Sequence, residues 1–447
     1  MNMARMWFIT AVFLGLARQI IASSGGDEES LQWSKDLCSQ LGDEYANLDY
    51  CGEIIGCTGA DSKEKGRYLR NSSRSSAFGW RLPGSSTCAW PGPLIRVERG
   101  TSYGLFVKGN VDKASWNYSM HLHGLHISSM GNGDDVRRRV AGSDVIFYNV
   151  TIPADHMGGT YWYHTHSHGQ SYHEMKNGAF GMLIVEDGDF GSVDAGVQKF
   201  MQNEQHLVVT NMLGLPGKFE ASKTHLEFVK DEWYRLRVLT MSLDSHQGVH
   251  TLSFDHPVGT SPDSMSMTSP LEAHGPCEIR TIAHDGILKF KVPSLKEQNS
   301  YTLNGASRID FAIRCTSEAD IIAGGKPVSM IKIDNESFPD KSISPFEGGI
   351  ESESGTWSSR RPYYLRDLRS EIVNSGDTWT IKMGEHDING YGYSTSERLC
   401  NDDHPNSKFI YNHVNEWYIK PSMHPVHVHV HPMQVVSEGG CDDYEEG

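Results

Sequence analysis

The sequence is poor in positive charge, has no C-x-x-C pair and, after its first residues, no long hydrophobic run. Lys and Arg number 40 against 56 Asp and Glu, and the formal net charge of −16 argues against a nucleic-acid partner because phosphates would be repelled. The missing C-x-x-C argues against a zinc ribbon or a thioredoxin-type redox motif. No later stretch is long enough to span a bilayer. The acidic balance fits a soluble protein and mildly favours cationic substrates or metal ions.

The first residues are typical of a targeting segment. The apolar run "MWFITAVFLGLA" (6–17) follows a positively charged start and precedes small residues at 22–24, so we predict a signal peptide over 1–24 and a secreted protein. A membrane anchor is the alternative, but Arg18 and Gln19 interrupt the run too early. Eight cysteines suit disulfides in an oxidising compartment, although their pairing stays open. N-x-S/T sequons begin at Asn71, Asn117, Asn149 and Asn335.

Short runs of period two, bounded by Gly, Pro and Asn, dominate the chain from residue 80 onward. "DVIFYNVTI" (144–152) places Ile146, Tyr148, Val150 and Ile152 on one strand face, and "WYRLRVL" (233–239) also alternates. Many such strands predict an all-β chain of sandwiches or barrels. Composition shifts predict a Cys-bearing N-terminal extension (25–79), in which Leu37 and Leu41 have a helix-like spacing, followed by β-domains over 80–192, 193–345 and 346–447.

Three segments carry clustered histidines: "HLHG" (121–124), "WYHTHSHGQ" (162–170) and "HPVHVHVHPMQVV" (424–436). Each contains H-x-H, and on a strand this spacing places two imidazoles on the same face. One such pair can be a solvated surface feature. Three pairs set among aromatic and apolar residues indicate metal, since buried imidazoles need partners. At least six histidines exceed what one zinc ion needs, and a nitrogen-only polynuclear site points to copper and O₂ chemistry.

These motifs resemble the multicopper oxidases, which are built from tandem cupredoxin-like Greek-key β-sandwiches. "WPGPLIRVERG" (90–100) resembles the lead-in strand of that family, and "LNGASRIDFAIRC" (303–315) resembles a strand of its middle domain. "HLHGLHISSMGNGDDV", "GTYWYHTHSHGQ" and "HPVHVHVHP" resemble its first three copper motifs, in order, with Leu122 and Val430 at positions where Trp and Gly are usual.

The resemblance implies a ligand set and one acid. His121 and His427 would hold a type 2 copper, and His424 would be one ligand of a type 1 copper. Asp134 would assist proton delivery through water, although a solvated loop acid is an equal alternative. The paired type 3 coppers would take His123, His164, His166 and His429. The histidines without a ligand position, with expected supporting or surface roles, are His126, His168, His173 and His431.

The fourth motif of the family, H-C-H, does not occur in the sequence. Its thiolate is the strong ligand of the type 1 site, so that site is incomplete here. Cys441 has no flanking histidine and is interpreted as a disulfide partner or free thiol. The third β-domain is also short, which fits a chain truncated at its C-terminal end. We therefore expect an incomplete third domain.

Two functions follow. The first is a copper-dependent oxidoreductase that removes single electrons from a phenol, an aromatic amine or a metal ion and reduces O₂ to water. The alternative is a secreted copper-binding cupredoxin-like glycoprotein without turnover, which a genuine stop after Gly447 would favour. A polynuclear zinc hydrolase is disfavoured because its carboxylate ligands are missing. Oligomeric state and substrate stay open.

Overall fold

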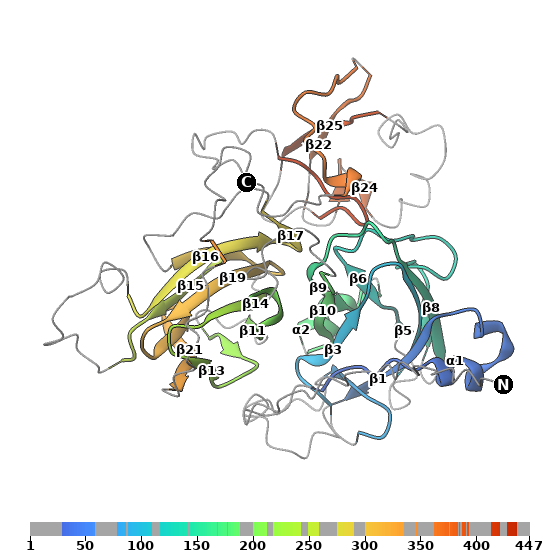
Figure 1. Ribbon diagram of the computed structural model, residues 1–447. Coiled ribbons are helices and arrows are strands. Elements are labelled where there is room, and N and C mark those ends of the chain that lie inside the picture. Colours follow the sequence, from blue (N-terminus) through green and yellow to red (C-terminus); the bar gives the residue numbers. More distant parts are fainter. Residues whose placement is uncertain are drawn as a thin grey trace, which may run out of the picture.

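The computed structural model describes residues 29–58, 78–85, 88–109, 117–141, 144–167, 169–176, 178–187, 200–211, 218–242, 249–258, 275–289, 300–334, 345–346, 362–374, 376–382, 384, 387–389, 391–392, 413–420 and 427–435. Within them the chain is almost entirely β-structure, arranged as two sandwiches and a smaller C-terminal part (Figure 1).

The first sandwich consists of two four-stranded sheets, in the orders β2-β1-β4-β8 and β3-β10-β9-β6. Along β8 the side chains alternate, so that Ile146, Tyr148, Val150 and Ile152 are buried and confirm the predicted face. The bounds are β1 Tyr50–Thr58, β2 Phe78–Arg81, β3 Gly92–Val97, β4 Thr101–Lys108, β6 His121–His123, β8 Val145–Ile152, β9 Gly159–His164 and β10 Phe180–Val185. Strands β5 (Asn117–Tyr118) and β7 (Val140–Ala141) form a small pair, and α2 (Ser171–Lys176) follows β9.

The segment predicted as an N-terminal extension contributes directly to the first sandwich. Helix α1 (Lys35–Leu41) begins at Ser34, whose hydroxyl accepts the Leu37 N–H, and the short 3-10 helix η1 (Asp43–Tyr45) follows. Strand β1 then pairs in parallel with β4 and antiparallel with β2, so the boundary placed at residue 80 falls inside a sheet. Disulfide Cys57–Cys88 attaches this segment covalently to the rest of the sandwich, whereas Cys38–Cys51 closes a loop within the segment. Its polar composition concealed a strand that only tertiary pairing reveals.

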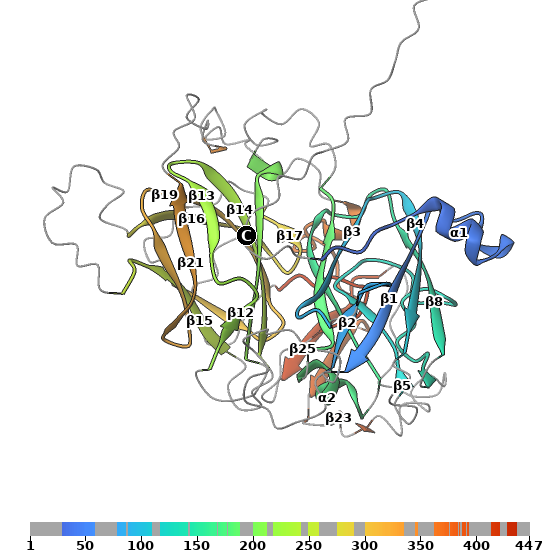
Figure 2. The ribbon, with the colours of Figure 1, turned by 90° about the horizontal axis from the view of Figure 1, so that it is seen from below.

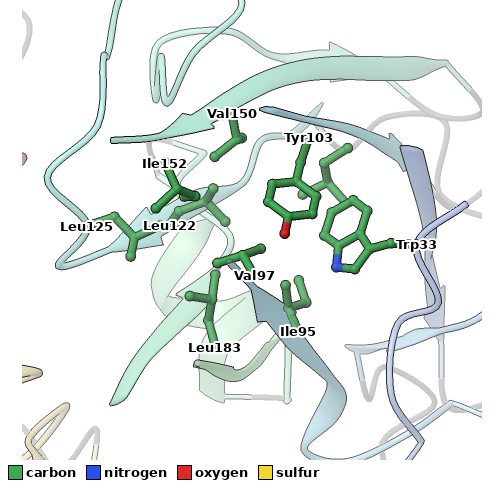
Figure 3. Close-up of a pocket in the computed structure, with 10 residues that line it drawn as sticks. Trp33, Ile95, Val97, Tyr103, Leu122, Leu125, Val150, Ile152 and Leu183 are labelled. Atoms are coloured by element: carbon green, nitrogen blue, oxygen red, sulfur yellow. The ribbon is translucent and has the colours of Figure 1, made fainter. Parts of the chain in front are cut away.

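The core between these sheets fixes the orientation of β6. Apolar side chains from both sheets, together with Trp33, surround a small cavity (Figure 3). Leu122 is among them, and it is 4% exposed. Because side chains alternate along a strand, the burial of Leu122 in this core turns His121 and His123 to the opposite face.

Tyr163 occupies the space beside two glycines in the same sandwich. A Cβ added at Gly181 of β10 would lie 2.4 Å from the Tyr163 hydroxyl oxygen, and one at Gly92 would lie 2.5 Å from it. The hydroxyl donates to the Pro93 carbonyl oxygen at 2.7 Å, so the ring cannot move freely. We expect Gly181→Ala to destabilise the chain by about 1–3 kcal/mol through overpacking, measured by urea unfolding. Gly376 is exposed, with open space at its Cβ position and no positive φ, so the same change there should stay within about 0.5 kcal/mol.

The second sandwich pairs a six-stranded sheet, β12-β11-β14-β19-β16-β17, with a five-stranded one, β13-β21-β20-β15-β18. Figure 2 shows it beside the first sandwich. Disulfide Cys277–Cys315 joins β16 to β19. The bounds are β11 Glu204–Asn211, β12 Glu220–Ala221, β13 Leu226–Val229, β14 Trp233–Ser242, β15 Val249–Asp255, β16 Cys277–His284, β17 Ile287–Leu288, β18 Ser300–Asn304, β19 Arg308–Cys315, β20 Ala319–Ala323 and β21 Lys326–Asp334.

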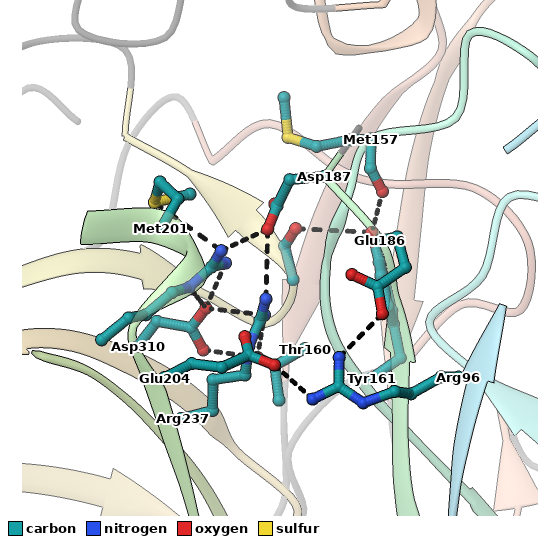
Figure 4. Close-up of polar contacts among 12 residues, drawn as sticks. Arg96, Met157, Thr160, Tyr161, Glu186, Asp187, Met201, Glu204, Arg237 and Asp310 are labelled. Carbon is teal, nitrogen blue, oxygen red and sulfur yellow. Dashed lines mark hydrogen bonds and ion pairs between the residues drawn. The ribbon is translucent and has the colours of Figure 1, made fainter. Parts of the chain in front are cut away.

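A buried ion cluster joins the two sandwiches (Figure 4). Strand β14 alternates as predicted, yet both of its faces are buried, and Arg235 and Arg237 are each 0% exposed. Asp310 on β19 accepts from Arg235 at 2.6 Å, from Arg237 at 3.3 Å and from the Thr160 hydroxyl of β9 at 2.6 Å. Asp187 of the first sandwich accepts from both arginines. The cluster therefore connects β9, which ends at His164, to the second sandwich.

The C-terminal part has little regular structure among its described residues. Strands β22 (Thr378–Lys382) and β25 (Glu416–Lys420) pair in parallel, and β23 (Asp387–Ile388) pairs with β24 (Tyr391–Gly392). The 3-10 helix η6 (Tyr363–Leu365) precedes them. No sandwich is closed by these described residues. The helices that the structure describes include none long and apolar enough to cross a membrane.

Candidate metal centre

Two neighbouring strands of the first sandwich present the first histidines of the centre. β6 pairs antiparallel with β9, so that His121 lies opposite His164, and the Tyr163 position faces Leu122. His121, His123 and His164 are 1%, 9% and 6% exposed. His166 follows the end of β9, where its backbone N–H donates to the Ser119 hydroxyl at 3.2 Å.

The C-terminal segment supplies two further imidazoles from some three hundred residues away in sequence. The ring of His427 stacks on that of His123 with centroids 3.7 Å apart, and the ring of His429 stacks on that of His121 at 4.0 Å. His166 and His429 meet edge to face at 5.0 Å. Six of the seven predicted ligands therefore gather in one place. The seventh, His424, and the unassigned His168 lie outside the described residues.

The ring nitrogens of this cluster point at one another. His121 Nε2 is 3.5 Å from His427 Nε2, and His123 Nδ1 is 3.3 Å from His164 Nε2. Two nitrogens that share one ion at about 2.0–2.1 Å lie roughly 3.3–3.6 Å apart for tetrahedral or trigonal angles. The same separations are long for a hydrogen bond. Ligand atoms of His121, His123 and His427 lie within 4.8 Å of one another, as do those of His121, Asp134 and His429. The residues present fit a metal held by several imidazoles.

Asp134 is buried against the cluster instead of standing in solvent. Its Oδ2 lies 2.7 Å from His121 Nδ1, and its Oδ1 accepts the Leu122 N–H at 2.9 Å. The carboxylate therefore keeps the proton of neutral His121 on Nδ1 and leaves Nε2 free for a ligand. Burial raises the pKa of Asp134 to about 7, against the lowering effect of the Leu122 N–H. The solvated-loop interpretation of this acid is wrong, because it is 3% exposed.

Burial holds the imidazoles neutral, which is the form that binds metal. It lowers the pKa values of His121, His123 and His164 well below the usual range and that of His427 to about 3. Neighbouring imidazoles add to these shifts, and so does Arg308, a 6%-exposed cation on β19. Sequence reasoning assigned Arg308 no role. Its place in the "LNGASRIDF" segment, two residues before Asp310, was the available signal.

Trp162 packs against the rings of His123 and His164, and the sequence had not assigned it a role. Its ring lies 4.2 Å from that of His164 and 4.6 Å from that of His123, centroid to centroid. His164 is further fixed by its Nδ1, which lies 2.7 Å from the Thr165 carbonyl oxygen and so leaves Nε2 facing His123. The aromatic surroundings noted in the sequence thus define the planes of both rings.

Of the histidines without a predicted ligand position, His126 packs beside the cluster. Its Nδ1 lies 2.9 Å from the Val430 carbonyl oxygen, and its ring stacks on Tyr364 at 4.0 Å. It thereby anchors the C-terminal segment next to His429. His173 is exposed on α2, and His431 is exposed at 5.9 Å from the His126 ring.

His156 gives this region a dependence on pH. It is 1% exposed, its Nε2 accepts the His126 N–H at 2.9 Å, and burial lowers its pKa from 6.5 to about 4. Because the folded-state pKa is the lower one, the unfolded chain takes up the proton first as pH falls. The contribution of neutral His156 to the free energy of unfolding is therefore complete above pH 6.5 and falls by about 3 kcal/mol between pH 6.5 and 4.

We expect His156→Gln, which keeps an acceptor for the His126 N–H, to remove this fall in the free energy of unfolding between pH 6.5 and 4. The measurement is the free energy of unfolding across this range, wild type minus variant, so that the other histidines cancel. His173→Gln is the exposed control, and equal slopes in wild type and His156→Gln would contradict the prediction.

The structure combines two cupredoxin-like β-sandwiches with a histidine cluster to which the first sandwich and the C-terminal segment both contribute. Residues 87–189 match a family model described as multicopper oxidase. The iron transport multicopper oxidase FET3 of Candida albicans is 32% identical over 106 residues, covering 23% of this chain and 16% of that protein. Laccase-1 of Thanatephorus cucumeris is 31% identical over 103 residues, covering 22% of this chain and 17% of that protein.

A solved laccase structure from Pediococcus acidilactici shares the fold, with a TM-score of 0.50 and 15% identity over 80% of this chain and 69% of that one. Residues 87–189 therefore resemble the multicopper oxidases, a family whose members hold copper. The matched stretch spans only 16% of the FET3 protein and 17% of the laccase.

Proposed function

We propose that the chain is a copper-dependent oxidoreductase of multicopper oxidase type. It would oxidise a phenol, an aromatic amine or a metal ion by single electrons and reduce O₂ to water. The observation that carries this proposal is the meeting of His121, His164 and His427, from three separate segments, with the Nε2 atoms of His121 and His427 3.5 Å apart and the rings of His121 and His164 5.2 Å apart. The relatives named as an iron transport oxidase and a laccase support both substrate classes.

The nitrogen directions support a division of the ligands. His121 and His427, whose Nε2 atoms face one another, would hold the type 2 copper. His123 and His164, also paired through nitrogen, would hold type 3 copper with His166 and His429. His424 would belong to a type 1 site, which lacks its cysteine in this sequence. Copper bound here would supply the one-electron steps and the reduction of O₂.

The protein's own groups prepare that chemistry. Asp134 orients His121 through its Nδ1–H and, with its pKa raised to about 7, can hold a proton near neutral pH. Trp162, which is 2% exposed and packs on the rings of His123 and His164, excludes water from one side of the cluster. Arg308 places a fixed positive charge beside the imidazoles, which opposes their protonation and favours an anionic guest.

We further propose that the protein is secreted. Three disulfides among the described residues, together with the apolar run over 6–17, support passage through an oxidising compartment. The second candidate is a secreted copper-binding protein without turnover, which would use the same histidine cluster.

Copper loading tests the proposal. The full chain, stripped with a chelator and reloaded with Cu²⁺, is expected to retain several copper ions and to consume O₂ when Fe²⁺ or a phenol is added. The zinc-loaded chain is the matched control and is expected to consume O₂ no faster than the substrate does in buffer alone. A chain that retains no copper above the stripped form overturns both candidate functions. Copper retention without O₂ uptake overturns the oxidase and leaves the binding protein.

A further inference from the structure

One sequon lies on the outer face of the first sandwich. In Asn149-Val150-Thr151, Val150 is buried in the core, so Asn149 and Thr151 point outward and both are exposed. Strand β8 is the edge of its sheet, paired only with β4 among the described strands. Its backbone donor at Asn149 bonds to the Asn132 carbonyl oxygen of the neighbouring loop at 2.5 Å.

A groove opens directly beside this sequon. It has a volume of about 300 Å³, it is mainly polar, and it is lined by Ser128, Met130, Asn132, Gly133, Asn149 and Thr151. Met130, at its rim, is 82% exposed. A concave polar surface with one apolar side chain suits a sugar, which has hydroxyl groups at its edge and C–H groups on its faces.

The other described sequon, at Asn117, is built differently. Asn117 is half-buried, and its backbone N–H donates to the Gln170 side chain at 3.0 Å. Its sequon hydroxyl, Ser119, is 0% exposed and accepts the His166 N–H. The space and the exposed sequon hydroxyl found at Asn149, where Thr151 contacts the Ser102 hydroxyl at 2.9 Å, are therefore missing at Asn117.

We propose that Asn149 carries an asparagine-linked glycan whose first sugars lie in this groove and cover the edge of β8. The modification rests on the proposed secretion. In the transfer, Asn149 Nδ2 forms a bond to C1 of the first sugar of a lipid-pyrophosphate-linked oligosaccharide. The C1–O bond to the pyrophosphate breaks, the lipid pyrophosphate leaves, and the amide loses one proton.

The glycan also acts on the loop that ends at the metal centre. Gly133 N–H donates to the Met130 carbonyl oxygen and Asp134 N–H to that of Ser128, each at 2.9 Å. The groove is the outer surface of this loop, and Asp134 at its end contacts His121. Sugars seated in the groove would restrain the loop and screen Met130 from other molecules.

The experiment expresses the full chain in a eukaryotic host under a heterologous secretory leader, so that the result does not depend on the chain's own leader or on its copper chemistry. Glycopeptide mass spectrometry before and after peptide N-glycosidase measures occupancy at each sequon. We expect Asn149 to be occupied in most secreted chains and Asn117 in few. Thr151→Ala should abolish occupancy at Asn149, and Thr151→Ser should keep it.

Thermal unfolding supplies the second readout. We expect Asn149→Gln to lower Tm by about 2–4 °C, the shift that 1 kcal/mol produces in domains of this size. Asn117→Gln keeps the glycan at Asn149, so enzymatic removal of the sugars should lower its Tm by no more than it lowers that of wild type. An unmodified Asn149 in the secreted chain, or equal occupancy at Asn117, overturns the proposal.

Discussion

Replacing Asp310 by Asn is expected to destabilise the chain by about 3–5 kcal/mol, because it removes a buried carboxylate that pairs with both Arg235 and Arg237. Arg235 and Arg237 are each 0% exposed, and both donate to Asp310 Oδ2. Asn keeps the shape and the acceptor for Thr160 but removes the negative charge. Asp187 remains as an acceptor for both arginines, and Glu204 remains as an acceptor for Arg237 at 2.7 Å. The free energy of unfolding in urea, followed by tryptophan fluorescence, measures the loss.

Two further variants make this prediction specific. Asp255→Asn changes an exposed carboxylate of the same sandwich, and its effect should stay within about 0.5 kcal/mol. The double variant Asp310→Asn, Arg235→Met should recover part of the loss, because the buried cation Arg235 is removed together with its carboxylate partner Asp310. A loss in Asp310→Asn no larger than that in Asp255→Asn would show that the cluster does not need its charge balance.

The sequence predicted the elements whose signal is local. The alternation over 144–152 predicted the buried face of β8, and the H-x-H spacing predicted the shared face of His121 and His123 on β6. The burial of Leu122 shows why: when the apolar residue between two histidines packs in the core, strand alternation turns both histidines to the opposite face. In the other two pairs His166 lies beyond the end of β9 and His427 and His429 lie outside every described strand, so strand alternation did not position them. The order of the motifs then indicated that distant segments would meet, and His121 and His427 do so.

The sequence could not predict features that arise between elements. Alternation in β14 gives two faces but not their surroundings, so the burial of Arg235 and Arg237 depends on acids from other strands. Likewise, β1 lies in a polar segment, and only its pairing with β4 assigns it to the sandwich. Arg308 and Trp162 act through neighbours brought from other strands, which no spacing rule encodes.

Replacing Asp134 by Ala is expected to weaken copper binding by about 10–100-fold, the effect of losing a group that orients a metal ligand. Asp134 accepts from His121 Nδ1 at 2.7 Å and thereby directs Nε2 toward His427. Without this acceptor the neutral imidazole can place its proton on Nε2 instead, which blocks the ligand atom. The affinity is measured by competition between the stripped chain and a copper chelator at fixed pH.

The neighbouring acid provides the matched control for Asp134. Asp135 is half-buried, and its carboxylate pairs with the exposed Arg137 at 3.2 Å and not with a histidine. Asp135→Ala should leave the affinity within about threefold, which corresponds to less than 1 kcal/mol. Asp134→Asn, which keeps an acceptor oxygen for Nδ1–H, should fall between wild type and Asp134→Ala. Equal losses in Asp134→Ala and Asp135→Ala would mean that net negative charge, and not the proton position on His121, governs the site.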